Sequence, residues 1–152
     1  MKILIIDDEE RFLHSTQKLL KRKGYDVETA SSGEKGLDLL LEKNIDVVIL
    51  DVKMPGIGGM ETLKRIKRQH PTVEVIMLTG HGTAEYAVDA LMWGASDFLI
   101  KPISVSEMIG KVEVSFARRL VLENKIRAAR DIEKDRHPES KQPINNESRK
   151  DK

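Results

Sequence analysis

The stretch IDVVILDVKMPGIGG, residues 45–59, contains the clearest structural signal in the chain. Its first half is an almost continuous apolar run, which is typical of a strand whose two faces are both covered by helices. The run ends in Asp51, and a loop rich in proline and glycine follows. Because ligands of parallel α/β sheets bind at the carboxyl ends of the strands, Asp51 is the first candidate for a functional residue.

Similar apolar runs recur along the chain, and helical patterns alternate with them. The other runs are residues 3–6, 27–30, 73–78 and 97–100. The helical patterns are marked by Phe12, Thr16, Leu19 and Leu20; by Leu37, Leu40 and Leu41; by Met60, Leu63 and Ile66; by Ala87, Ala90 and Leu91, expected to face inward; and by the segment after Ser104. We therefore expect an α/β fold with a doubly wound, five-stranded parallel sheet in the flavodoxin-like order 2-1-3-4-5 and five helices.

Three serine and threonine positions predict where helices begin. Ser31 with Glu34, and Ser104 with Glu107, have the spacing of a capping box. Thr83 is the candidate cap of the fourth helix.

The chain of 152 residues is long enough for one domain with an extension. We expect the domain at residues 1–120, a continuation of the fifth helix at 121–134, and a disordered charged tail at 135–152. A formal net charge of +1 does not indicate a polyanionic partner. Since there is no cysteine, disulfides, thiolate zinc sites and thiol catalysis are excluded. No signal-peptide core or membrane-length apolar run is present, so we expect a cytoplasmic protein.

Polar residues follow four of the five apolar runs. Asp7 and Asp8 follow the first, Asp51 the third, Thr79 the fourth and Lys101 the fifth. Three carboxylates form an oxygen-rich, incomplete ligand set that suits Mg²⁺. An aspartate beside Mg²⁺ can act as a nucleophile towards a phosphoryl group, with the lysine and threonine as phosphate partners. Each residue alone is typical of a turn, a cap or a solvated surface, but together they predict a phosphoryl-transfer site.

Four segments, in order, resemble the signature blocks of the bacterial two-component response-regulator receiver domain. They are ILIIDDEE, VVILDVKMPGIGGMETLKRIK, VIMLTGHG and GASDFLIKPI, and the resemblance covers residues 1–120. The longer segment LTGHGTAEYAVDALMWGASDFLIKPI is especially similar to receivers of enhancer-binding transcriptional activators. The resemblance implies that a sensor histidine kinase or a phosphotransfer protein phosphorylates Asp51 in a Mg²⁺-dependent reaction.

The resemblance also implies a role for each site residue. The Mg²⁺ ligands would be Asp7, Asp8, Asp51 and the backbone carbonyl of Lys53. Lys101 would pair with the phosphoryl group, and the bond between Lys101 and Pro102 would be cis.

Further positions would control switching and kinetics. Thr79 would move towards the phosphoryl group, and Phe98 would turn inward with it. Lys53 and His81 are large and could shield the acyl phosphate from water, so we predict a lifetime of many minutes or more. Gly80 would leave room for the phosphodonor.

The expected output is a change of partner at the face formed by the fourth helix, fifth strand and fifth helix. The partner would be a downstream protein, an output domain outside this sequence, or a second copy of the chain. The extended fifth helix favours a homodimer, although a solvated surface helix is the alternative.

The signalling module would phosphorylate and dephosphorylate only itself, so we do not expect an enzyme with an external substrate. Two other function classes compete with this interpretation. A Mg²⁺-dependent phosphohydrolase could use the same acidic rim, but Lys53 occupies the place where a second aspartate would be expected. Direct nucleic-acid binding by the basic end is not favoured, because residues 118–152 mix eleven Lys/Arg with seven Asp/Glu and contain no aromatic residue.

Overall fold

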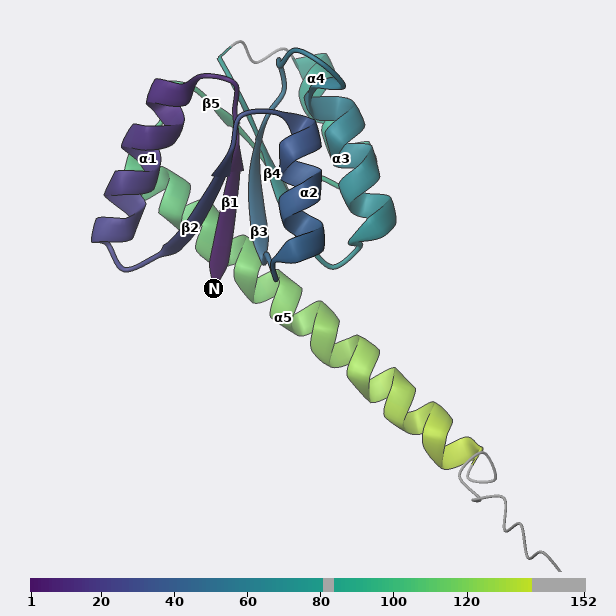
Figure 1. Ribbon diagram of the computed structural model, residues 1–152. Helices are drawn as coiled ribbons and strands as arrows, with labels where there is room; N and C mark the ends of the chain where they lie inside the picture. The colour runs from purple at the N-terminus through teal and green to yellow at the C-terminus, as the bar shows by residue number, and fades with distance from the viewer. Residues whose placement is uncertain (81–83, 138–152) are drawn as a thin grey trace, which may run out of the picture.

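The computed structural model describes residues 1–80 and 84–137 (Figure 1). Along the chain, the elements are β1 (Lys2–Ile6), α1 (Glu10–Arg22), β2 (Asp26–Ala30), α2 (Gly33–Glu42), β3 (Val47–Asp51), α3 (Gly58–Gln69), β4 (Glu74–Thr79), α4 (Ala84–Met92), β5 (Asp97–Ile100) and α5 (Val105–Arg136). The five strands are parallel and lie in the order β2-β1-β3-β4-β5. The predicted fold class and strand order are confirmed.

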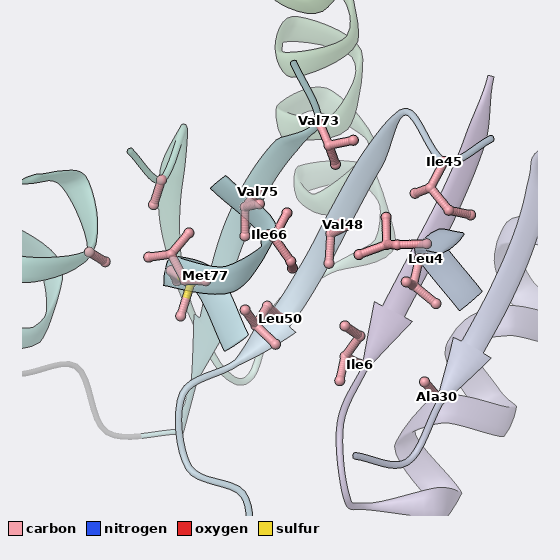
Figure 2. Close-up of a cluster of buried hydrophobic side chains, with 14 of the residues drawn as sticks. Leu4, Ile6, Ala30, Ile45, Val48, Leu50, Ile66, Val73, Val75 and Met77 are labelled. Atoms are coloured by element: carbon pink, nitrogen blue, oxygen red, sulfur yellow. The ribbon is translucent and has the colours of Figure 1, made fainter. Parts of the chain in front are cut away.

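Helices cover both faces of the sheet, as the apolar runs require. In Figure 1, α1 and α5 lie on one face, and α2, α3 and α4 on the other. Alternate residues of a strand therefore enter two separate cores: Leu4 and Ile6 pack towards α2 and α3, whereas Ile3 and Ile5 pack towards α1 and α5. Figure 2 shows the first of these cores, where Leu50 of β3 is also fully buried. The two cores hold the strand ends, and the polar residues on them, in fixed register.

The predicted capping residue is confirmed for α5 but not for α2. The Ser104 hydroxyl accepts a hydrogen bond from the Glu107 N–H at 3.1 Å, as predicted for α5. In α2 the cap is Ser32, which accepts from the Lys35 N–H at 3.2 Å, so the predicted cap at Ser31 is wrong by one residue. Ser32 has the extended backbone of a capping position, and the helix begins directly after it. The predicted cap at residue 83 lies outside the described residues.

The buried faces of the short helices are made of smaller residues than we expected. Leu91 of α4 was predicted to face inward but is 51% exposed, and Leu41 of α2 is 73% exposed. Instead, the buried residues of α2 are Gly33, Gly36 and Leu40. A Cβ atom on Gly36 would lie 2.3 Å from Cδ1 of Ile6, so a glycine at this position lets α2 approach β1 closely.

The fifth helix is 32 residues long and runs well beyond the sheet (Figure 1). It ends at Arg136, two residues after the predicted end at residue 134. Residues 138–152, most of the predicted tail, lie outside the described residues. Of the helices in the described part of the chain, none combines the length and apolar composition that crossing a bilayer would require.

Candidate functional site

The strand register brings the predicted site residues to one rim of the sheet. Asp7 follows β1 directly, Asp51 is the last residue of β3, Thr79 is the last residue of β4, and Lys101 follows β5 directly. Within the sheet, Asp51 pairs with Leu78, the residue before Thr79. Because all the strands are parallel and in register, their carboxyl ends meet, and residues far apart in the sequence become neighbours.

Three carboxylates cluster at the centre of this rim. One oxygen atom from each of Asp7, Asp8 and Asp51 lies within 4.8 Å of the others, and Asp7 and Asp51 are buried while Asp8 is exposed. Burial, followed by the charge of Asp7, raises the pKa of Asp51 to about 6, and Asp8 adds to the effect. Lys101 and the Lys53 N–H oppose this rise without cancelling it. The cluster therefore carries unbalanced negative charge on hard oxygen ligands, which fits a divalent cation such as Mg²⁺.

Lys101 is the cation that the fold itself supplies to the cluster. Its Nζ lies 2.6 Å from Oδ2 of Asp7 and 3.7 Å from Oε2 of Glu9. Burial alone would lower the pKa of Lys101, but the hydrogen bond and charge of Asp7, together with Asp51 and Glu9, raise it. The side chain therefore stays an ammonium at neutral pH. The peptide bond between Lys101 and Pro102 is cis, as predicted.

Three positions close to Asp51 and Thr79 were predicted to tune the kinetics: residues 53, 80 and 81. The Lys53 N–H donates to Oδ1 of Asp51 at 3.3 Å, and its side chain is exposed. No described atom lies within 4 Å of a Cβ placed on Gly80, so there is open space next to Thr79. Residue 81 lies outside the described residues. The roles of Lys53 as a carbonyl ligand and of all three positions in kinetics stay predictions.

The two predicted switch residues lie on neighbouring strands. Thr79 is buried, and its backbone carbonyl accepts a hydrogen bond from the Lys101 N–H at 2.7 Å. Phe98 pairs with Met77 in the sheet and is half-buried against the core beneath α2, α3 and α4. Thr79 therefore lies at the rim, whereas Phe98 lies two residues before the end of the adjacent edge strand, and the movement of both stays a prediction.

Two residues of the site were not singled out by sequence reasoning. The ring of Phe12, which we had assigned only to the helical pattern, lies 4.2 Å from Nζ of Lys101 in a cation–π contact. Gly59, the second residue of α3, lies against the end of β3, since a Cβ there would lie 2.1 Å from the carbonyl oxygen of Asp51. The position of Phe12, one helical turn after Asp8, could have indicated the first contact. The glycine-rich loop alone did not show which glycine is needed.

Comparison with known proteins gives one consistent family. The family model described as the response regulator receiver domain matches residues 3–113. Transcriptional regulatory protein ZraR of Escherichia coli O157:H7 is 36% identical over 121 residues, which are 80% of this chain and 27% of that protein. Transcriptional regulatory protein CpxR of Escherichia coli K12 is 38% identical over 117 residues, which are 77% of this chain and 50% of that protein. The chain thus spans half or less of the length of these curated relatives.

Solved structures agree with this comparison. A response regulator receiver domain protein from Clostridium thermocellum is 41% identical with a TM-score of 0.75, covering 80% of this chain and 98% of that one. The NtrX protein of Brucella abortus, in complex with ADP, is 30% identical with a TM-score of 0.76, covering 81% of this chain and 28% of that one.

Proposed function

Because this chain belongs to the response-regulator receiver domain family, we propose that its Asp51 accepts a phosphoryl group from a sensor histidine kinase or phosphotransfer protein with the help of Mg²⁺. The observation that carries this proposal is the clustering of the Asp7, Asp8 and Asp51 carboxylates beside the Lys101 ammonium. This arrangement supports the proposal, because the carboxylate that would act as the nucleophile lies on the same rim as the residues that would bind the cation and the phosphoryl group.

The proposed reaction transfers a phosphoryl group from a histidine side chain of the donor to Asp51. A carboxylate oxygen of Asp51 attacks the phosphorus of a phosphohistidine, the new O–P bond forms while the P–N bond breaks, and the imidazole leaves with that electron pair. When bound by Asp7, Asp8 and Asp51, Mg²⁺ would offset the charge of the carboxylates and of the phosphoryl oxygens. Lys101 is charged and already at the rim, where it can exchange Asp7 for a phosphoryl oxygen.

The phosphorylated state would act as a signal and not as a step of substrate turnover. A phosphoryl group adds about two negative charges and three strong acceptors, to which Lys101 and Thr79 respond. We propose that this shifts a pre-existing equilibrium through Thr79 and Phe98 towards a changed α4–β5–α5 face. Exposed apolar side chains that could contact a protein partner occur on α4 and at the end of β5: Tyr86, Val88, Leu91, Met92 and Ile100.

The test is intact-mass analysis of the protein after incubation with Mg²⁺ and acetyl phosphate. We expect one added phosphoryl group, absent from Asp51→Asn and from a sample without Mg²⁺. The absence of an adduct, both here and with a phosphorylated histidine kinase as donor, would contradict the proposal. Continuous phosphate release from a panel of phosphate esters would instead favour a Mg²⁺-dependent phosphohydrolase.

A further inference from the structure

The loop between β3 and α3 is tied to the first turn of α2 by one carboxylate. Oε1 of Glu34 accepts a hydrogen bond from the Ile57 N–H at 3.0 Å. The same oxygen would lie 2.6 Å from a Cβ on Gly56, whose φ is +80°. The Glu34 carboxylate therefore lies directly over the loop backbone, and a glycine at residue 56 provides both the space and the left-handed conformation.

This contact is polar and exposed, so it does not belong to either hydrophobic core. The pKa of Glu34 is lowered by its own backbone N–H and by the Ile57 N–H, with the Ser32 hydroxyl and Arg65 adding to the effect against burial. Glu34 is therefore ionised at neutral pH and accepts a charge-assisted hydrogen bond, which is stronger than one between neutral groups.

The loop that Glu34 holds begins at the acidic cluster. The Val52 N–H donates to the Leu78 carbonyl at 3.0 Å, which fixes the loop's start to β4. The next residue is Lys53, which donates to Asp51 and whose carbonyl is the fourth ligand in the proposed cation site. Glu34 holds the other end at Ile57, so the residues between them are restrained from both sides.

We propose that Glu34 is a positioning residue for the cation site: by holding the far end of the loop, it orders the Lys53 carbonyl before the cation binds. The inference rests on the proposed function, because it concerns the same site. Ordering a ligand in advance removes an entropic cost from binding, and loss of such outer contacts weakens metal affinity by about 10- to 100-fold in known metal sites.

The test compares Mg²⁺ binding by isothermal titration calorimetry at about 0.15 M ionic strength, where long-range attraction is screened. We expect Glu34→Ala to bind Mg²⁺ about tenfold more weakly than the wild type. Glu34→Gln should stay within about threefold, because its amide oxygen still accepts from the Ile57 N–H. Glu42→Ala, which removes an exposed glutamate at the other end of α2, is the matched control and should bind like the wild type.

A second measurement follows the loop without metal. Amide hydrogen exchange at Ile57 should be about tenfold faster in Glu34→Ala, and unchanged in Glu42→Ala. Equal Mg²⁺ affinity of Glu34→Ala and the wild type would overturn the inference alone, and so would equal losses in Glu34→Gln and Glu34→Ala, which would indicate a charge effect. No Mg²⁺ binding by the folded wild type would overturn the proposed function, and the inference with it.

Discussion

At the scale of single residues, Asp51 is held where its charge is unfavourable in the metal-free protein. Its pKa rises from the ordinary 3.8 to about 6, first because of burial and then because of Asp7. The folded state therefore binds this proton more tightly than the unfolded chain does. The resulting loss of stability is absent well below pH 3.8, grows as the pH rises, and is complete above about pH 6.

Replacing this carboxyl should therefore stabilise the metal-free protein. We expect Asp51→Asn to raise the free energy of unfolding by up to about 3 kcal/mol at pH 7, since one pKa unit corresponds to about 1.4 kcal/mol. At pH 4 the gain should fall below about 1 kcal/mol. Urea unfolding with EDTA at both pH values measures the difference. A gain that does not depend on pH would contradict the argument, and saturating Mg²⁺ should stabilise the wild type more than the variant.

Phe12 should matter through the position of Lys101. Replacing Phe12 with Leu keeps an apolar side chain but removes the aromatic face that lies 4.2 Å from Nζ. A cation–π contact contributes about 0.5–2 kcal/mol, so we expect phosphorylation by acetyl phosphate to slow by about two- to thirtyfold. The rate of mass gain measures this effect. Phe12→Tyr keeps the ring face and should behave like the wild type; if it slows equally, packing and not the cation contact is responsible.

At the scale of elements, the start of α2 shows how a local motif can be misplaced by one residue. Two adjacent serines precede the helix, and Ser32, whose backbone is extended, is the one whose hydroxyl accepts the hydrogen bond from the Lys35 N–H. Ser31 has the predicted spacing to Glu34, but the Glu34 carboxylate interacts with the Ser32 hydroxyl and also accepts a hydrogen bond from the Ile57 N–H of the loop before α3. The carboxylate therefore serves a tertiary contact in addition to the local cap, which the spacing of a capping box does not show.

The two serines should differ in their effect on stability. We expect Ser32→Ala to lower the free energy of unfolding by about 1 kcal/mol, because it removes the acceptor for the Lys35 N–H. Ser31→Ala should change it by less than about 0.5 kcal/mol, because its hydroxyl only accepts an exposed hydrogen bond from the Lys35 ammonium. Chemical denaturation of both variants measures the difference. A larger loss of stability in Ser31→Ala than in Ser32→Ala would indicate that Ser31 is the cap.

At the scale of the whole molecule, α5 is the element that extends well beyond the sheet (Figure 1). Arg119 holds the helix against the segment that leads into β3. It is buried, its guanidinium donates to the Ile45 carbonyl, and it lies 3.5 Å from Oδ1 of Asp46. Val114, Val121 and Ile132 are more than half exposed, at 59%, 54% and 55%. Their spacing of seven and eleven residues places them on one side of the helix, and we propose that this stripe pairs with a second copy of the chain.

Polar substitution of this stripe should weaken self-association. We expect Val121→Asn with Ile132→Asn to raise the dimer dissociation constant at least about tenfold, since burial of each aliphatic side chain contributes about 1.5–3 kcal/mol. Sedimentation velocity over a range of concentrations measures the constant. Arg130→Gln, on the opposite side of the helix, is the control. A wild-type chain that stays monomeric at every concentration, with and without phosphorylation, would contradict the homodimer.

The family, the strand order and the composition of the rim were all readable from the chain. Apolar runs too continuous for a half-exposed strand require a parallel sheet covered on both faces, and Asp7, Asp51 and Lys101 come directly at the ends of such runs. These are local properties, because they depend on residues adjacent in the sequence. They were therefore enough to predict which side chains would meet.

How those side chains meet was decided by the packing of elements that are distant in the sequence. The ring of Phe12 over Lys101, the contact of Gly59 with Asp51 and the Glu34 bond to Ile57 each depend on how closely one helix approaches a neighbouring strand or loop. The exposure of Leu41 has the same origin, since α2 approaches β1 closely at Gly36. Such distances are set by the volumes of both partners at once, and no single stretch of sequence contains that information.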